Sequence, residues 1–266
     1  MKRSLVATLV LGFITALVFA LLYGPILVSV VSSFFTIQRG AIDWDTFNLS
    51  AYVKLTRNTS ILEAVGHTFL VGLVAVVAST VIGTGMALYY LGGKSRAREF
   101  LQLLIFLPFL TPPIVTGLSL LIFFREIDFP RSLVTVAIGH VLFVLALVYR
   151  IVLMRLQSIS ANLIEASYDL GASRWQTFSL VLLPNLKSAM LGAAVLAFAL
   201  SFDETMITIM LTGTENTLPM RLWAMMRIGF TPDINALITI ILVLTTVLCC
   251  LVGRQLMPKS VMTFDE

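Results

Sequence analysis

The chain has 266 residues, of which 58% are hydrophobic and only 12% are charged. Since a soluble globular domain has about 25% charged residues, this composition excludes water as the main solvent of the protein. The formal net charge is +4, but the sequence contains no basic run, so it gives no indication that the protein binds nucleic acid.

Six apolar stretches are long enough to cross a bilayer, which takes roughly 20 residues per helix. The first follows Met1-Lys2-Arg3 and is far longer than the apolar core of a signal peptide, so we expect an uncleaved first helix. The sequence therefore predicts an all-α, polytopic membrane protein in which residues 1–266 form a single domain. The six expected transmembrane helices cover residues 5–31, 65–91, 100–124, 132–154, 188–211 and 234–255.

The basic residues indicate how these helices are oriented. If both termini are cytoplasmic, eleven of the 18 Lys and Arg residues lie on the cytoplasmic side, in the direction of the positive-inside rule. We therefore expect both termini in the cytoplasm, with the inverted topology as the alternative. The eleven residues are Lys2, Arg3, Lys94, Arg96, Arg98, Arg150, Arg155, Arg174, Lys187, Arg254 and Lys259.

The second and third expected helices carry patterns of their own. The third contains Pro108, Pro112 and Pro113, and each proline removes a backbone donor and disfavours helix before it. Non-helical backbone at membrane depth needs protein or a watery cavity around it, so Pro112 and Pro113 are candidate residues of a substrate pathway, with a packing kink as the alternative. The second helix has small residues at every fourth position, which allow another helix to approach closely: Ala75, Ser79, Gly83 and Ala87.

The segment between the fourth and fifth expected spans, residues 150–187, begins with the signals of a short helix. Asn162 can cap this helix, with Glu165 three residues on. The residues that share one apolar face of the helix are Leu163, Ala166 and Leu170.

A tight turn and a second helix follow. Gly171 is placed to end the first helix in a left-handed conformation. Ser173 and Gln176 form a Ser-x-x-Gln capping box that opens the second helix, which ends before Pro184. The sequence therefore predicts a folded helix-turn-helix at the membrane surface.

The fifth expected span contains two adjacent carboxylates, Asp203 and Glu204. They lie about 22 Å beyond Ser188, in the outer half of the bilayer, at a rise of about 1.5 Å per residue. Carboxylates at this depth are costly and face a bundle interior, a partner or a substrate path. The pair is suited to a cationic substrate, and a structural hydrogen-bonded pair is the alternative.

The remaining reactive residues do not form a chemical site. His67 and His140 lie in different spans without ligand partners nearby, and Cys249 and Cys250 are adjacent in the last span. Residues 93–95 read Gly-Lys-Ser but lack the earlier glycine and the preceding strand of a phosphate-binding loop. We expect no catalytic residue, metal, cofactor or nucleotide site on this chain.

One motif in the segment between the fourth and fifth spans resembles a known family. Glu165-Ala166-Ser167, then Gly171, then Val181, Leu183 and Pro184 resemble the EAA loop of bacterial ABC importer permeases at every spacing, with Ser167 and Val181 as mild departures. In that family the loop is a coupling helix seated in a groove of a cytoplasmic ATPase. The resemblance implies ATPase-coupling roles for Glu165, Ala166, Ser167, Leu170, Gly171, Ser173 and Pro184.

Further landmarks resemble the spermidine/putrescine permease subfamily over nearly the whole chain. They are Ser201-Phe202-Asp203-Glu204, Thr212-Gly213, Leu218-Pro219 and residues 233–237. The resemblance implies a polyamine substrate with Asp203 and Glu204 on its pathway. Permeases for iron, phosphonates, opines or amino-acid derivatives share much of this architecture and are the alternatives.

The same resemblance implies the partners of the chain. They are a cytoplasmic ATPase dimer that holds ATP and Mg, a second and different permease subunit, a periplasmic substrate-binding protein, and the lipid of the bacterial inner membrane. Two rival classes lack these partners. A motor-free secondary transporter has no need of the capped loop, and a membrane-embedded enzyme needs a nucleophile or metal cluster that the sequence does not offer.

Overall fold

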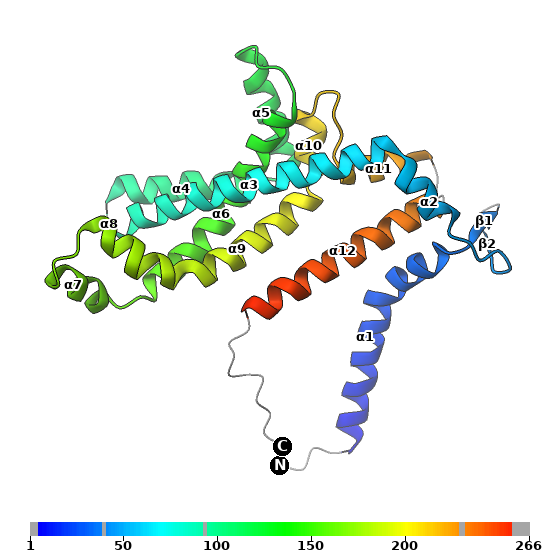
Figure 1. The fold of residues 1–266 in the computed structure, drawn as a ribbon, viewed down its shortest axis with the longest axis horizontal. Helices are drawn as coiled ribbons and strands as arrows, with labels where there is room; N and C mark the ends of the chain where they lie inside the picture. Colours follow the sequence, from blue (N-terminus) through cyan, green and yellow to red (C-terminus); the bar gives the residue numbers. More distant parts are fainter. Residues whose placement is uncertain (1–4, 39–40, 93–94, 229–231, 257–266) are drawn as a thin grey trace. The chain divides into compact units, whose positions relative to one another are not determined.

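The computed structural model of the chain describes residues 5–38, 41–92, 95–228 and 232–256 and is almost entirely α-helical (Figure 1). Four of the eleven basic residues expected on the cytoplasmic side lie outside the described residues: Lys2, Arg3, Lys94 and Lys259. The chain divides into two compact units, residues 1–62 with 222–253, and residues 63–221 with 254–266.

The first unit contains two long helices and a small hairpin. The side chain of Asn235 on α12 (Pro232–Leu256) donates a hydrogen bond of 3.2 Å to Ser32 Oγ on α1 (Leu5–Ser32). The Ser33 hydroxyl lies 2.7 Å from the Tyr52 hydroxyl of α2 (Ser50–Arg57). Between α1 and α2, β1 (Thr36–Gln38) and β2 (Ala41–Asp43) form an antiparallel pair.

The second unit contains the helices that hold the candidate site. Helix α3 starts in the first unit and continues into the second, and α11 starts in the second and continues into the first. The elements are α3 (Thr59–Leu91), α4 (Arg96–Leu110), α5 (Pro113–Glu126), α6 (Leu133–Gln157), α7 (Ala161–Asp169), α8 (Arg174–Gln176), the π-helical segment η1 (Thr177–Leu182), α9 (Leu183–Asp203), α10 (Met206–Leu211) and α11 (Leu218–Ile228).

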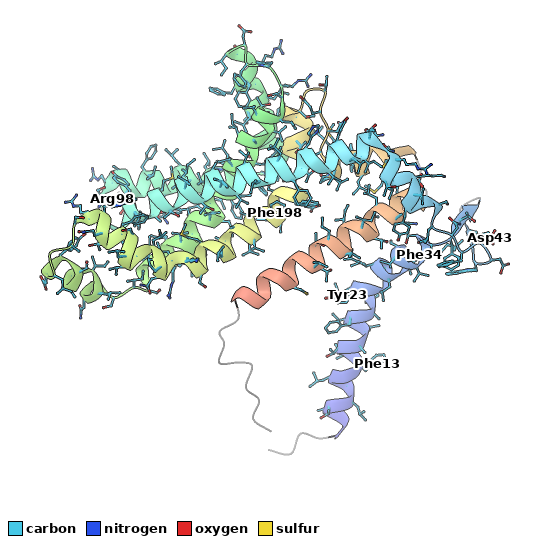
Figure 2. All side chains as sticks on the ribbon, in the orientation of Figure 1. Phe13, Tyr23, Phe34, Asp43, Arg98 and Phe198 are labelled. Atoms are coloured by element: carbon cyan, nitrogen blue, oxygen red, sulfur yellow. The ribbon has the colours of Figure 1, made fainter. Side chains whose placement is uncertain are left out.

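Helix α6 forms the centre of this unit, and α3, α4 and α9 run beside it (Figure 1). The small-residue face expected on the second span packs against α6, because a Cβ at Gly83 would lie only 3.2 Å from the Tyr149 backbone nitrogen. Phe198 of α9 lies against α3, where a Cβ at Gly72 would lie 2.9 Å from the Phe198 ring (Figure 2). Close backbone approach therefore holds the bundle together, as expected for helices in lipid.

Four helical segments of the described chain are long and apolar enough to cross a membrane: Ala7–Ser32, Thr59–Leu91, Leu133–Gln157 and Arg174–Asp203. A fifth is added if α4 and α5 are taken as one broken span, since they are bent by 108° at a short break. In α12 the stretch Asp233–Val247 is apolar but shorter. The all-α membrane fold is thus confirmed, and the count of six spans stays a prediction.

Candidate functional site

The turn that follows α7 is a Schellman motif, in which two backbone hydrogen bonds close the end of the helix. The Ala172 N–H donates to the Ser167 carbonyl at 3.0 Å, and the Gly171 N–H donates to the Tyr168 carbonyl at 2.8 Å. Gly171 has a φ of +82°, a conformation that costs glycine nothing and other residues about 1–2 kcal/mol. The left-handed end predicted at Gly171 is confirmed.

The beginning of α7 differs from the expectation. Ser160 is the N-cap residue, α7 starts at Ala161, and no side chain caps it. The prediction that Asn162 caps this helix is therefore wrong. Packing explains the difference, because the earlier start points Ile164 at the hydrophobic core and leaves Asn162 exposed.

The second helix opens with the predicted capping box. Ser173 Oγ accepts a hydrogen bond of 3.3 Å from the Gln176 N–H, and Gln176 Oε1 accepts one of 2.8 Å from the Ser173 N–H. These two bonds satisfy donors that a free helix end leaves without partners.

This second helix does not end before Pro184. Residues Arg174–Asp203 form one continuous helical segment, with a π-helical register over η1. The wider register agrees with the missing N–H of Pro184, which cannot continue the regular α-helical ladder. Next to Pro184, the side-chain amide nitrogen of Asn185 donates a hydrogen bond of 2.8 Å to the Val181 carbonyl.

Ser167, the third residue of the EAA-like motif, lies inside the helix-turn-helix. Its hydroxyl donates to the Ile164 carbonyl at 2.7 Å, so its oxygen accepts the 2.9 Å hydrogen bond from the Thr177 hydroxyl. Both side chains are buried, Ser167 at 9% and Thr177 at 1% exposure. This bond ties α7 to η1. The sequence alone gives no sign of Thr177, because the pairing depends on how the two helices cross.

The opposite face of the helix-turn-helix is exposed and apolar. Leu170 is 89% exposed and Trp175 is 71% exposed, and Glu165 and Ala166 are exposed beside them. The expected face of Leu163, Ala166 and Leu170 therefore points outward. Exposed aromatic and aliphatic side chains on a stiff support are suited to contact with another protein.

A further contact, missed by the sequence reasoning, joins the two ends of the helix-turn-helix. Arg155 Nε, near the end of α6, donates a hydrogen bond of 2.9 Å to the Asn185 carbonyl near the start of α9. The guanidinium also lies 3.4 Å from the Ser158 hydroxyl. The two ends of the helix-turn-helix are thus hydrogen-bonded to each other, in addition to the Ser167–Thr177 bond between its two helices.

The prolines of the third expected span stand at a break between α4 and α5. Pro112 is the N-cap residue of α5, and Pro113 is its first residue. The Thr111 hydroxyl between the two helices donates to the Pro108 carbonyl at 3.1 Å and lies 2.7 Å from the Thr116 hydroxyl. Hydroxyl groups thus replace part of the hydrogen bonding that the prolines remove.

A second break separates Asp203 from Glu204. Helix α9 ends at Asp203, Glu204 is extended with ψ of 108°, and α10 begins at Met206. Glu204 is 8% exposed, and its Oε1 accepts a hydrogen bond of 2.9 Å from the Ile207 N–H. Asp203 is exposed. The two carboxylates therefore have different surroundings: Glu204 caps α10, and the Asp203 side chain is accessible.

The two breaks are linked by packing, because α5 lies against α10. A Cβ at Gly117 of α5 would lie 3.1 Å from the Cα of Ile207 on α10. Ile207 and Leu211 of α10 share a buried cluster with Phe124 of α5 and Val136 of α6. The structure thus packs α5, which starts after Pro112, against α10, which starts three residues after Asp203.

Solved structures share this fold. The chain resembles a subunit of a bacterial ABC transporter involved in the import of the acidic polysaccharide alginate, with a TM-score of 0.73, 16% identity, and coverage of 93% of this chain and 94% of the other. It also resembles a subunit of the MetNI methionine ABC transporter in inward-facing conformations, with a TM-score of 0.63, 17% identity, and coverage of 79% and 98%. At these identities the likeness concerns the fold alone.

Sequence relatives are more similar. The spermidine/putrescine transport system permease protein PotC of Escherichia coli (strain K12) is 32% identical over 252 residues, covering 94% of this chain and 93% of PotC. The putrescine transport system permease protein PotI of the same organism is 32% identical over 232 residues, covering 84% and 82%. The family described as binding-protein-dependent transport system inner membrane component matches residues 79–258. The chain therefore belongs to this family of inner membrane components of binding-protein-dependent transport systems.

Proposed function

We propose that the chain is the permease subunit of an ATP-driven importer of polyamines such as spermidine and putrescine. It crosses the bacterial inner membrane six times with both termini in the cytoplasm. The names of the relatives PotC and PotI support the substrate class. The observation that carries the proposal is the helix-turn-helix, which is fixed internally and exposes an apolar face.

In this proposal α7 and the turn after it form the coupling helix. Leu170, Ala166 and Glu165 contact a groove of a cytoplasmic ATPase, while Ser167, Gly171 and Ser173 keep the two helices stiff. Pro184 marks the point at which the loop joins the fifth span. ATP and Mg are bound by the ATPase dimer, and this chain performs no catalysis.

Force applied to the coupling helix has a direct route to the substrate pathway. The helical segment that starts at Arg174 ends at Asp203. Its 30 residues span about 45 Å, which is enough to cross the bilayer. Movement of the ATPase dimer is thus transmitted along one element to the break at Asp203.

The surroundings of Asp203 support its place on the pathway. Leu196, Leu200 and Asp203 are all exposed on α9, so the carboxylate stands at the end of an otherwise apolar surface. A carboxylate facing hydrocarbon is costly. This surface of α9 therefore faces the second permease subunit, and the pathway between the two subunits is lined by Asp203, with Pro112 and Pro113 at the neighbouring break.

A carboxylate is suited to the ammonium groups of a polyamine. A periplasmic binding protein delivers the solute, and the ATPase dimer switches the paired permeases between outward-facing and inward-facing states. Membership of a binding-protein-dependent family argues against a motor-free secondary transporter. Amino-acid derivatives, opines, phosphonates and iron are the competing solutes.

The test is reconstitution of the whole complex. The chain is expressed with a candidate ATPase, a second permease and a candidate binding protein from the same organism, purified together and placed in liposomes. We expect ATP hydrolysis to rise with binding protein loaded with spermidine or putrescine, and to stay at the basal rate with the competing solutes. Stimulation by another solute alone, or uptake without an ATPase, would contradict the proposal.

A further inference from the structure

His140 lies in the middle of the unit and is almost completely buried, at 1% exposure. Its ring is 2.8 Å from the Ser201 hydroxyl through Nδ1 and 2.9 Å from the Thr208 hydroxyl through Nε2. Ser201 lies in the last turn of α9, and Thr208 lies in α10. A single ring on α6 therefore bridges the two sides of the break at residues 204–205.

The direction of each hydrogen bond follows from the fact that each hydroxyl group and the neutral imidazole ring has one proton to donate. The Thr208 hydroxyl has one proton, and it donates this proton to the Glu204 carbonyl at 2.9 Å. Thr208 Oγ1 must therefore accept from His140, so Nε2 carries the ring proton. In the neutral imidazole Nδ1 is then an acceptor, and Ser201 donates to it. The result is a directed chain from Ser201 through His140 and Thr208 to the backbone of Glu204.

This chain fixes the break in a place where the backbone has few bonds of its own. The Glu204 N–H reaches the Ser201 carbonyl only at 3.4 Å, the long end of the hydrogen-bond range. The far end of α10 has a separate anchor, since the Thr135 hydroxyl lies 2.8 Å from the Leu211 carbonyl and shares its one proton between that carbonyl and the Ser132 carbonyl, also at 2.8 Å. His140 thus controls the near end of α10 and the last turn of α9, which carries Asp203.

We propose that His140 is a positioning residue that sets the orientation of the Asp203 carboxylate on the substrate pathway, without contacting the substrate. The inference rests on the proposed role of Asp203. It adds His140, 63 positions before Asp203 in the sequence, as a residue that determines how the Asp203 carboxylate binds a cation.

The hydrogen-bond directions are tested first, independently of transport. The chain has only two histidines, so a His67→Gln variant labelled with ¹⁵N-histidine gives the signals of His140 alone. We expect the Nε2-protonated tautomer in bilayers. Wild-type protein also shows the signals of His67, whose Nδ1 lies 3.1 Å from the Asn216 carbonyl and must carry the ring proton. His67 is therefore the reference for the opposite, Nδ1-protonated tautomer. An Nδ1-protonated His140 would overturn the inference.

The link to Asp203 is tested in the reconstituted complex by a double-mutant cycle. We expect Thr208→Val or His140→Gln to raise the half-saturating spermidine concentration roughly tenfold, within the range of coupling for one hydrogen-bond network. When Asp203→Asn is already present, neither Thr208→Val nor His140→Gln should raise the half-saturating concentration further. Additive effects, or a change in maximal rate alone, would count against a positioning role.

Thr135→Val is the matched control. Thr135 and Thr208 are both completely buried, both bond α10, and both lose only a hydroxyl in the change to valine. We expect Thr135→Val to lower thermal stability and leave the half-saturating concentration unchanged; an equal rise in both variants would refute the inference. A wild-type complex that shows no polyamine response would instead overturn the proposed function, while the tautomer experiment still reports on the hydrogen-bond chain.

Discussion

Asp203 and Glu204 are neighbours in the chain, but only Glu204 has its carboxylate bound by the fold. Its Oε1 accepts the hydrogen bond from the Ile207 N–H, so this oxygen lies at the start of α10. Such capping bonds contribute about 0.5–2 kcal/mol. Asp203 is exposed, and none of the hydrogen bonds among the described residues ends on its carboxylate. Two residues that look equivalent in the sequence therefore have separable roles.

We predict that replacing Asp203 affects polyamine uptake, whereas replacing Glu204 affects thermal stability. Asp203→Asn should leave thermal stability unchanged and reduce polyamine uptake, because it removes a charge from the pathway. Glu204→Ala should lower the free energy of unfolding by about 1 kcal/mol, because the Ile207 N–H loses its acceptor. Thermal unfolding in detergent and uptake in liposomes check both. Equal loss of uptake in a stable Glu204→Gln variant would show that Glu204 also acts on substrate.

Gly171 allows a second prediction at this scale. A Cβ there would meet no atom within 4 Å, so the cost of replacing it comes from its φ of +82° alone. Gly171→Ala should therefore destabilise the turn by about 1 kcal/mol, and Gly171→Asn by less, because asparagine tolerates this conformation better. We expect ATP hydrolysis stimulated by the binding protein to fall in the same order. Equal effects of the two changes would contradict the strain argument.

At the scale of elements, the two faces of the helix-turn-helix have different roles. The inner face is held by Ser167 and Thr177, and the outer face presents Leu170 and Trp175. A change on the outer face alters only what a partner contacts. A change on the inner face alters the shape of the element itself.

Leu170→Asp is predicted to abolish copurification with the ATPase while the permease keeps its thermal stability. The reason is that a charge replaces an apolar side chain that is 89% exposed. Thr177→Val is the control for the inner face, and it should lower stability because the Ser167 hydroxyl loses its partner. Retention of the ATPase by a stable Leu170→Asp variant would remove Leu170 from the interface.

How much of this element could be predicted depends on the range of each interaction. The Ser173–Gln176 box and the left-handed Gly171 follow from residues within four positions of each other, and both were predictable. The start of α7 was not, because core packing of Ile164 overrides the local signal of Asn162. The partners of His140 lie 61 and 68 residues away, so no local pattern could reveal them.

At the scale of the whole molecule, composition was enough to predict an all-α membrane protein, but not the breaks in its helices. The prolines at 108, 112 and 113 indicated the first break. The second break, after Asp203, contains no proline or glycine. It depends on Glu204, His140 and Thr208, which together replace the missing backbone bonds.

The close approach of α3 and α6 leads to the last prediction. A Cβ at Gly83 would lie 3.2 Å from the Tyr149 nitrogen, whereas a Cβ at Gly85 would meet nothing within 4 Å. Gly83→Leu should therefore destabilise the permease by about 1–3 kcal/mol, the usual cost of overpacking. Gly85→Leu has the same change in helix propensity and should be tolerated. Similar melting temperatures for the two variants would contradict the packing of α3 on α6.

In the proposed mechanism, the continuous helical segment from Arg174 to Asp203 would also act as a lever arm. If it pivots at the coupling turn, a tilt of only 10° moves its far end by about 8 Å, given a length of about 45 Å. This displacement is about twice a van der Waals contact distance of roughly 4 Å. If the proposed ATPase binds at the Gly171 turn, a rotation of this size there would be large enough to open or close the proposed pathway at Asp203.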